Sequence, residues 1–88
     1  MNVREQVSDY IVESFLFGDG RGLTPSMSLL GSGTIDSTGV LELVMFLEKS
    51  FGVEVRDQDL TPENLDSVER IAQFVERKRT VSSVRAEG

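Results

Sequence analysis

The 88-residue chain contains no cysteine, no histidine and no tryptophan, and only two prolines. The lack of cysteine excludes disulfides and thiolate nucleophiles, and the lack of histidine removes the commonest general base and most zinc or copper ligand sets. No apolar run approaches the roughly 18 residues that span a bilayer. We therefore expect a cytosolic protein with no metal site, no membrane insertion and no catalytic site of its own.

The length and the charge narrow the possibilities further. A chain of this size forms about one small domain, which we place at residues 1–79, followed by a frayed tail at 80–88. The net charge of −6 argues against nucleic acid as a partner. Acids dominate residues 36–69, a pattern that would attract basic partner surfaces but also fits a merely solubilising exterior. We expect a monomer.

Hydrophobic spacing predicts an amphipathic helix over residues 3–16, followed by a long connection. The apolar residues of the helix recur at three and four: Val3, Val7, Tyr10, Ile11 and Phe15. Gly18, Gly20 and Gly22 then end the pattern, and residues 17–35 show no clear period. Loops of this length tend to be functional or to pack down. The residues expected to pack are Leu23, Met27, Leu29 and Leu30.

A second helix is expected from Asp36 and Ser37, either of which could cap it, to residue 51, where Gly52 would end it. The segment around residues 60–62 predicts a short third helix or turn. Asp66 or Ser67 would cap a last helix, whose negative end would suit the basic residues 77–79. The predicted fold is therefore all-α: a small four-helix bundle of three main helices plus one short helix, with a long first loop.

The second helix has more apolar residues than its core face requires. One arc of about 100° already holds a sufficient core face: Val40, Leu43, Val44, Leu47 and Phe51. Leu41, Met45 and Phe46 fall outside this arc, on the side of Glu42 and Glu48. A face both apolar and acidic indicates a binding surface. Alternatively, the long loop covers some of these residues, Phe46 in particular.

Ser37 by itself would be read as an ordinary helix cap. No histidine is present, and no lysine stands in a recognisable serine-nucleophile motif, so nothing in the chain could activate its hydroxyl. Any chemistry at Ser37 must come from another protein. The alternative to a modified serine is a non-catalytic helical interaction or regulatory module in which Ser37 serves only as a cap.

Three stretches together resemble the acyl carrier protein family: residues 33–37 (GTIDS), 42–48 (ELVMFLE) and 51–53 (FGV). The similarity covers most of residues 3–78. It implies that a phosphopantetheinyl transferase attaches 4'-phosphopantetheine to Ser37, directly after Asp36. The thiol of this arm would carry an acyl or aminoacyl group as a thioester, which would explain how a carrier can lack cysteine.

The resemblance also implies which residues partner enzymes would recognise. These partners would be acyl or aminoacyl ligases and synthases with basic docking surfaces. The implied recognition residues are Asp36, Thr38, Leu41, Glu42, Met45 and Glu48.

Two departures from the family pattern follow Ser37. Thr38 stands where the family usually has leucine, and Gly39 would weaken the first helical turn by up to about 1 kcal/mol relative to alanine. The acid often found two residues after the serine is also missing. These features are more similar to specialised free-standing carriers, including aminoacyl carriers, than to the carrier of fatty-acid synthesis. Fatty acyl, polyketide and aminoacyl cargoes all stay open.

Overall fold

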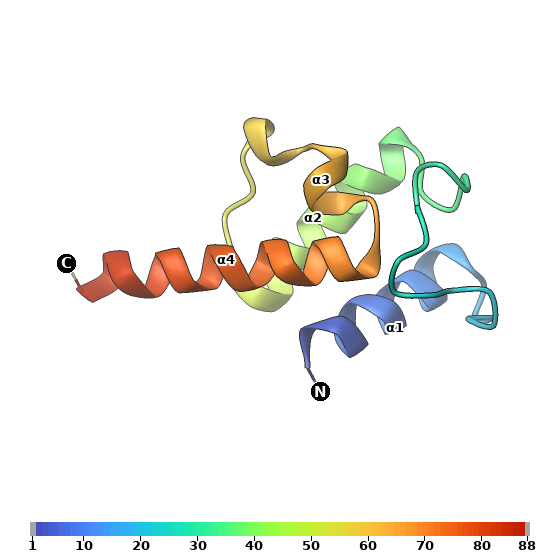
Figure 1. Cartoon of the computed structure of the whole chain (residues 1–88), viewed down its shortest axis with the longest axis horizontal. Helices are drawn as coiled ribbons and strands as arrows, with labels where there is room; N and C mark the ends of the chain where they lie inside the picture. The colour runs from blue at the N-terminus through green and yellow to red at the C-terminus, as the bar shows by residue number, and fades with distance from the viewer. Residues whose placement is uncertain (1, 88) are drawn as a thin grey trace.

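The computed structural model describes the backbone of residues 2–87 and the side-chain surroundings of residues 2–79. Within these residues all regular structure is helical, which confirms the all-α prediction of three main helices and a short one. Figure 1 shows their arrangement. The elements are α1 (Val3–Phe15), α2 (Ser37–Phe51), the 3₁₀ turn η1 (Asp57–Asp59), α3 (Pro62–Leu65) and α4 (Val68–Glu87).

Helix α4 is the element on which the other helices pack. Both α1 and α3 lie against it, and α2 contacts it as well. Each long helix turns its apolar stripe inward, as the three-and-four spacing predicts. Burying each large aliphatic or aromatic side chain contributes about 1.5–3 kcal/mol. The fully buried residues with the largest side chains are Ile11, Leu29, Leu43, Leu47, Ile71 and Phe74.

Local signals set the helix boundaries. The Asn2 side chain accepts a hydrogen bond from the Glu5 amide at the start of α1. Gly52 ends α2 in a left-handed conformation with φ 69°, which glycine adopts at no steric cost. Of the two residues expected to cap α4, it is Ser67 that does so, because its hydroxyl accepts from the Arg70 amide.

Asp66 instead fastens the long connection between α1 and α2. Its carboxylate accepts hydrogen bonds from the Ser28 hydroxyl (2.8 and 2.9 Å) and from the Leu30 amide (2.9 Å). Its backbone carbonyl accepts from the amide of Leu29, whose side chain is completely buried. The connection therefore packs down as expected, except that Leu30 stays 38% exposed. This anchoring holds the chain that leads into α2.

Helical backbone continues through residues 80–87, where the sequence predicted a frayed tail. The side chains of residues 80–88 lie outside those described, so the domain boundary at residue 79 stays a prediction. Within the described residues, no helix combines the length and the apolar character that crossing a membrane requires.

Candidate functional site

Asp36 and Ser37 have different structural roles at the start of α2. Asp36 has extended backbone angles, and its carboxylate accepts a hydrogen bond from the Gly39 amide (2.7 Å) while its carbonyl accepts from the Val40 amide (2.9 Å). Asp36 is therefore the N-cap, and Ser37 is the first residue inside the helix. The interpretation of Ser37 as the cap is wrong, because the extended residue whose side chain reaches forward is the one before it.

The Ser37 side chain is exposed, and its hydroxyl has no hydrogen-bond partner among the described residues. The amides of Ser37 and Thr38 belong to the first turn and have no carbonyl one turn earlier in the helix to bind. The positive end of the helix dipole adds to this local preference for an anion. An exposed hydroxyl beside two free amides is chemically compatible with a phosphate ester on Ser37.

Gly39 is buried and packs against the end of α1. A β-carbon at this position would lie 2.8 Å from Cε1 of Phe15 and 3.1 Å from Cγ2 of Ile35. At the shorter distance the Phe15 ring would have to shift to admit a side chain, so close packing favours glycine here. The expectation that Gly39 merely weakens the first turn is therefore incomplete, because the glycine lets α1 and α2 meet. Thr38, beside it, is exposed.

The outward side of α2 carries the residues expected there. Leu41 is 59% exposed and Met45 is 68% exposed, although both are large hydrophobic residues. Glu42 and Glu48 are also exposed, and the Glu48 carboxylate accepts a hydrogen bond from the Val55 amide (3.0 Å). The structure thus brings the predicted recognition residues together on one accessible face. It also gives Glu48 a second task, since it holds the segment that follows α2.

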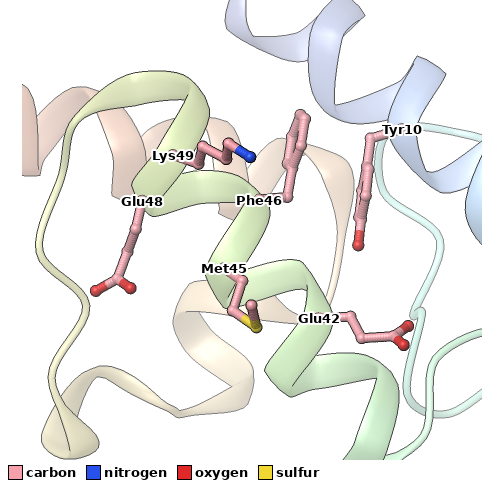
Figure 2. Close-up of a pocket in the computed structure, with 6 residues that line it drawn as sticks. All are labelled: Tyr10, Glu42, Met45, Phe46, Glu48 and Lys49. Carbon is pink, nitrogen blue, oxygen red and sulfur yellow. The ribbon is translucent and has the colours of Figure 1, made fainter.

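Phe46 is only partly exposed, and an aromatic ring of α1 packs against it. Its ring stacks on Tyr10 of α1, with centroids 4.0 Å apart and planes 8° from parallel (Figure 2). An open hollow of about 550 Å³ adjoins the pair. Burial raises the pKa of Tyr10, and the nearby Glu42 carboxylate raises it further. Sequence reasoning assigned Tyr10 to the core stripe of α1 and missed this contact, because the spacing within one helix says nothing about its neighbour.

Comparison with known proteins decides the family. No protein-family model matches the chain. A relative from Solidesulfovibrio magneticus is 32% identical over 79 residues, which is 90% of this chain and 97% of the relative. One from Bdellovibrio bacteriovorus is 33% identical over 78 residues (89% and 96%), and one from Campylobacter hominis is 34% identical over 76 residues (86% and 92%). All three are named acyl carrier protein. The chain belongs to the acyl carrier protein family.

Membership of this family makes the chain a carrier and not an enzyme. The match to the first of these relatives spans 90% of this chain, so the departures at Thr38 and Gly39 lie within the matched region.

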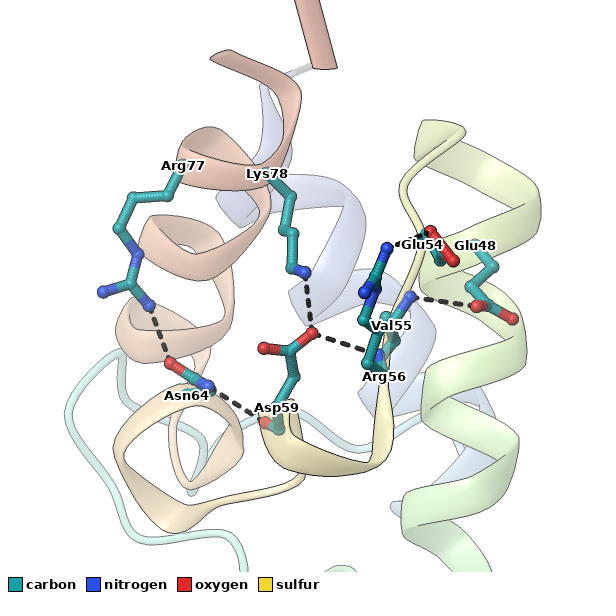
Figure 3. Close-up of polar contacts among 8 residues, drawn as sticks. All are labelled: Glu48, Glu54, Val55, Arg56, Asp59, Asn64, Arg77 and Lys78. Carbon is teal, nitrogen blue, oxygen red and sulfur yellow. Dashed lines mark hydrogen bonds and ion pairs between the residues drawn. The ribbon is translucent and has the colours of Figure 1, made fainter. Parts of the chain in front are cut away.

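The basic residues 77–79 do not lie at the C-terminal end of α4, where the sequence predicted them. Because α4 continues to Glu87, residues 77–79 are in its interior and not at its negative end. Lys78 pairs with Asp59 of η1 (2.7 Å), and Arg77 donates to the Asn64 side chain of α3 (2.7 Å), as Figure 3 shows. The Lys78 ammonium holds the pKa of Asp59 below its usual value. These contacts clasp η1 and α3 to α4.

Proposed function

We propose that Ser37 carries 4'-phosphopantetheine and that the carrier presents an acyl group, held on this arm, to partner enzymes. The proposal rests on the different structural roles of Asp36 and Ser37 at the start of α2. Asp36 supplies the cap, which leaves the exposed Ser37 hydroxyl without a structural task. When bound, the arm would supply the thiol that this cysteine-free chain lacks and would hold the acyl group as a thioester.

Attachment requires a phosphopantetheinyl transferase and coenzyme A. The Ser37 oxygen would form the new bond to the phosphorus that bears the pantetheine, and the pyrophosphate bond of coenzyme A would break. Adenosine 3',5'-bisphosphate would leave, and the serine proton would pass to a base on the transferase. The carrier has no histidine, and Asp36, its neighbouring acid, is engaged with Gly39. We propose a cytoplasmic location, where coenzyme A and the transferase would both be available.

The chain's own residues would hold the attached group at the helix start. The free amides of Ser37 and Thr38 favour the phosphodiester, while the bond from Asp36 to Gly39 fixes the first turn. We assign partner recognition to residues on the side of α2 beyond Ser37, with Asp36 and Thr38 at its start. The apolar members offer area for contact, and the acidic members attract basic docking surfaces. The residues of this face are Leu41, Glu42, Met45 and Glu48.

We favour an acyl cargo over an aminoacyl one. The three relatives that the chain matches over about nine-tenths of its length are all named acyl carrier protein. Thr38 removes the apolar side chain that the family usually has after the serine, which supports a selective transferase more directly than it supports a different cargo.

The test is incubation of the purified carrier with coenzyme A and a broad-specificity phosphopantetheinyl transferase, followed by intact-mass measurement. The expected result is a mass increase of one phosphopantetheine in the wild type and none in Ser37→Ala. Circular dichroism of Ser37→Ala should show the same helical content, since the Ser37 hydroxyl makes no hydrogen bond among the described residues. A mass increase that persists in Ser37→Ala would move the attachment site elsewhere.

A further inference from the structure

An aromatic row joins α1 to α2 on the carrier's surface. Its centre is the stacked pair of Tyr10 and Phe46. Phe15 meets the Tyr10 ring edge-on with centroids 5.8 Å apart, and Phe51 meets the Phe46 ring edge-on at 5.9 Å. Tyr10 and Phe46 are both only partly buried, so the middle of the row is accessible from outside. Neither ring is part of the recognition face assigned above.

Two hollows flank the stacked pair. The larger, of about 550 Å³, is drawn in Figure 2, where the Tyr10 and Phe46 rings stand side by side above the Met45 thioether. The second, of about 320 Å³, lies toward α1 and also includes both rings. Both are wide open to solvent, so they suit protruding side chains of a docked protein better than an enclosed small molecule. We call the two hollows and the rings between them the Tyr10–Phe46 groove.

The rim of the Tyr10–Phe46 groove is acidic. Asp9 and Glu13 of α1 line the smaller hollow, and Glu42 and Glu48 of α2 line the larger one. Among the residues whose side chains the structure describes, Lys49 is the one cation that lines either hollow. The floor is apolar because it consists of the two rings and the Met45 side chain. Arginine and lysine match such a site, since their methylene stems pack on apolar surface while their charged ends reach a carboxylate.

We propose that the Tyr10–Phe46 groove continues the recognition face of α2 onto α1 and binds a basic amphipathic segment of a partner protein. Its arginine or lysine side chains would enter the two hollows toward the carboxylates, and its apolar residues would cover the exposed ring edges. This surface extends recognition from α2 onto α1, and it does not depend on modification of Ser37. Nucleic acid does not fit, because its phosphates would meet the same carboxylates.

A second copy of the carrier is a poor occupant because several of its described cations are engaged within the chain. Arg4 forms a bidentate ion pair with Glu69, in which two guanidinium nitrogens each lie 2.6 Å from a carboxylate oxygen. Lys78 pairs with Asp59, and Arg77 is bonded to Asn64, as described above. Docking a second copy through these residues would first break contacts that join its own elements. A separate basic segment would bind without breaking such contacts.

The test is a titration of the unmodified, isotope-labelled carrier with a short synthetic peptide, followed by amide chemical shifts. The peptide is helical, with leucines on one face and arginines flanking it, and a control peptide replaces each arginine by glutamate. The expected result is a saturable shift of the amides of Asp9, Tyr10, Glu13 and Phe46 with the basic peptide alone. Raising the salt concentration should weaken binding.

A matched pair of double variants makes the test quantitative. Asp9→Asn/Glu13→Gln should weaken peptide binding about fivefold, as expected for two neutralised rim charges. Glu63→Gln/Glu76→Gln removes the same charge from exposed sites away from the groove and should change affinity less than about twofold. Circular dichroism confirms that each variant is folded.

Three outcomes would overturn the proposal. Equal losses in the two double variants would mean that the peptide senses net charge and not the groove. Shifts confined to Thr38 and Leu41, which line neither hollow, would place the peptide on the α2 face alone. Shifts of the α1 amides that grow with carrier concentration, without peptide, would identify a second copy as the occupant.

Discussion

Gly39 lies so close to Phe15 that a β-carbon at residue 39 would come within 2.8 Å of the phenylalanine ring. The contact joins the first turn of α2 to the last turn of α1, two residues beyond Ser37. Helix propensity alone would favour alanine over glycine at this position by about 1 kcal/mol. Packing opposes that preference, because a methyl group would fit only if the Phe15 ring and the Ile35 side chain moved.

We predict that Gly39→Ala lowers the free energy of unfolding by about 1–3 kcal/mol, as overpacking does in other buried sites. Thr38→Ala is the matched control, since Thr38 is exposed and adjacent, and it should change stability by no more than about 0.5 kcal/mol. Urea denaturation monitored by circular dichroism measures both. Trimming the ring with Phe15→Leu should recover part of the loss in the double variant. A Gly39→Ala protein more stable than the wild type would refute the packing account.

The cap and the attachment site should respond separately to mutation. Asp36→Ala removes the acceptor for the Gly39 amide and should cost about 0.5–2 kcal/mol of stability. Asp36→Asn keeps an acceptor oxygen and should lose less. Ser37→Ala should stay within about 0.5 kcal/mol of the wild type, because the hydroxyl makes no contact among the described residues. If Ser37→Ala instead proved the more damaging change, the assignment of the cap to Asp36 would be wrong.

The ion pair between Asp59 and Lys78 predicts that the stability of the fold depends on pH. Because the folded-state pKa of Asp59 is depressed, the pair stabilises the fold above the unfolded value of about 3.9, and this stability is lost as the pH falls through the folded pKa. Lys78→Gln should therefore be less stable than the wild type at pH 7. The gap should narrow below about pH 4 and close once Asp59 is protonated in both proteins.

Arg79→Gln provides the control for the ion pair, since Arg79 is exposed, adjacent and of the same charge. The stability of Arg79→Gln relative to the wild type should change little between pH 7 and the lowest pH of the series. Thermal unfolding across the pH series measures both variants. A gap for Lys78→Gln that stays constant down to the lowest pH would show that the loss is due to packing against Phe74, over whose ring the ammonium lies, and not to the ion pair.

The acidic recognition face predicts salt-dependent loading. Glu42→Gln/Glu48→Gln should slow modification by the transferase about threefold or more at low ionic strength, and the difference should fade as salt screens the charges. Glutamine is the suitable replacement because Glu48 must still accept the hydrogen bond of the Val55 amide. Initial rates measured by mass spectrometry decide the matter, with Glu63→Gln/Glu76→Gln as the control of equal charge. Equal rates in both double variants at every salt concentration would remove the electrostatic part of recognition.

The positions of α1 and α2 and the C-terminal end of α2 could be predicted from the sequence because their signals are local. The three-and-four spacing places α1 and α2, and Gly52 supplies the left-handed stop that its position requires. The choice between Asp36 and Ser37 as cap was not decidable from residue type, since both side chains accept hydrogen bonds. It depended on which residue takes extended backbone angles.

The contacts between elements could not be predicted in the same way. Nothing within α2 indicates that Tyr10 would cover Phe46, because the two residues are far apart in the chain and meet only through the packing of α1. The burial of Gly39 by Phe15 has the same origin. The prediction that residues 77–79 lie at a helix end was wrong. Lys78 and Arg77 lie within α4, where they pair with residues of η1 and α3.

The most direct test of the central claim is the intact mass of the protein isolated from its native source, with fragmentation to locate any added group. The account predicts a phosphopantetheine on Ser37, alone or bearing an acyl group as a thioester that hydroxylamine releases. A protein that carries no addition in the native source, and that gains none from coenzyme A and a transferase, would contradict the account.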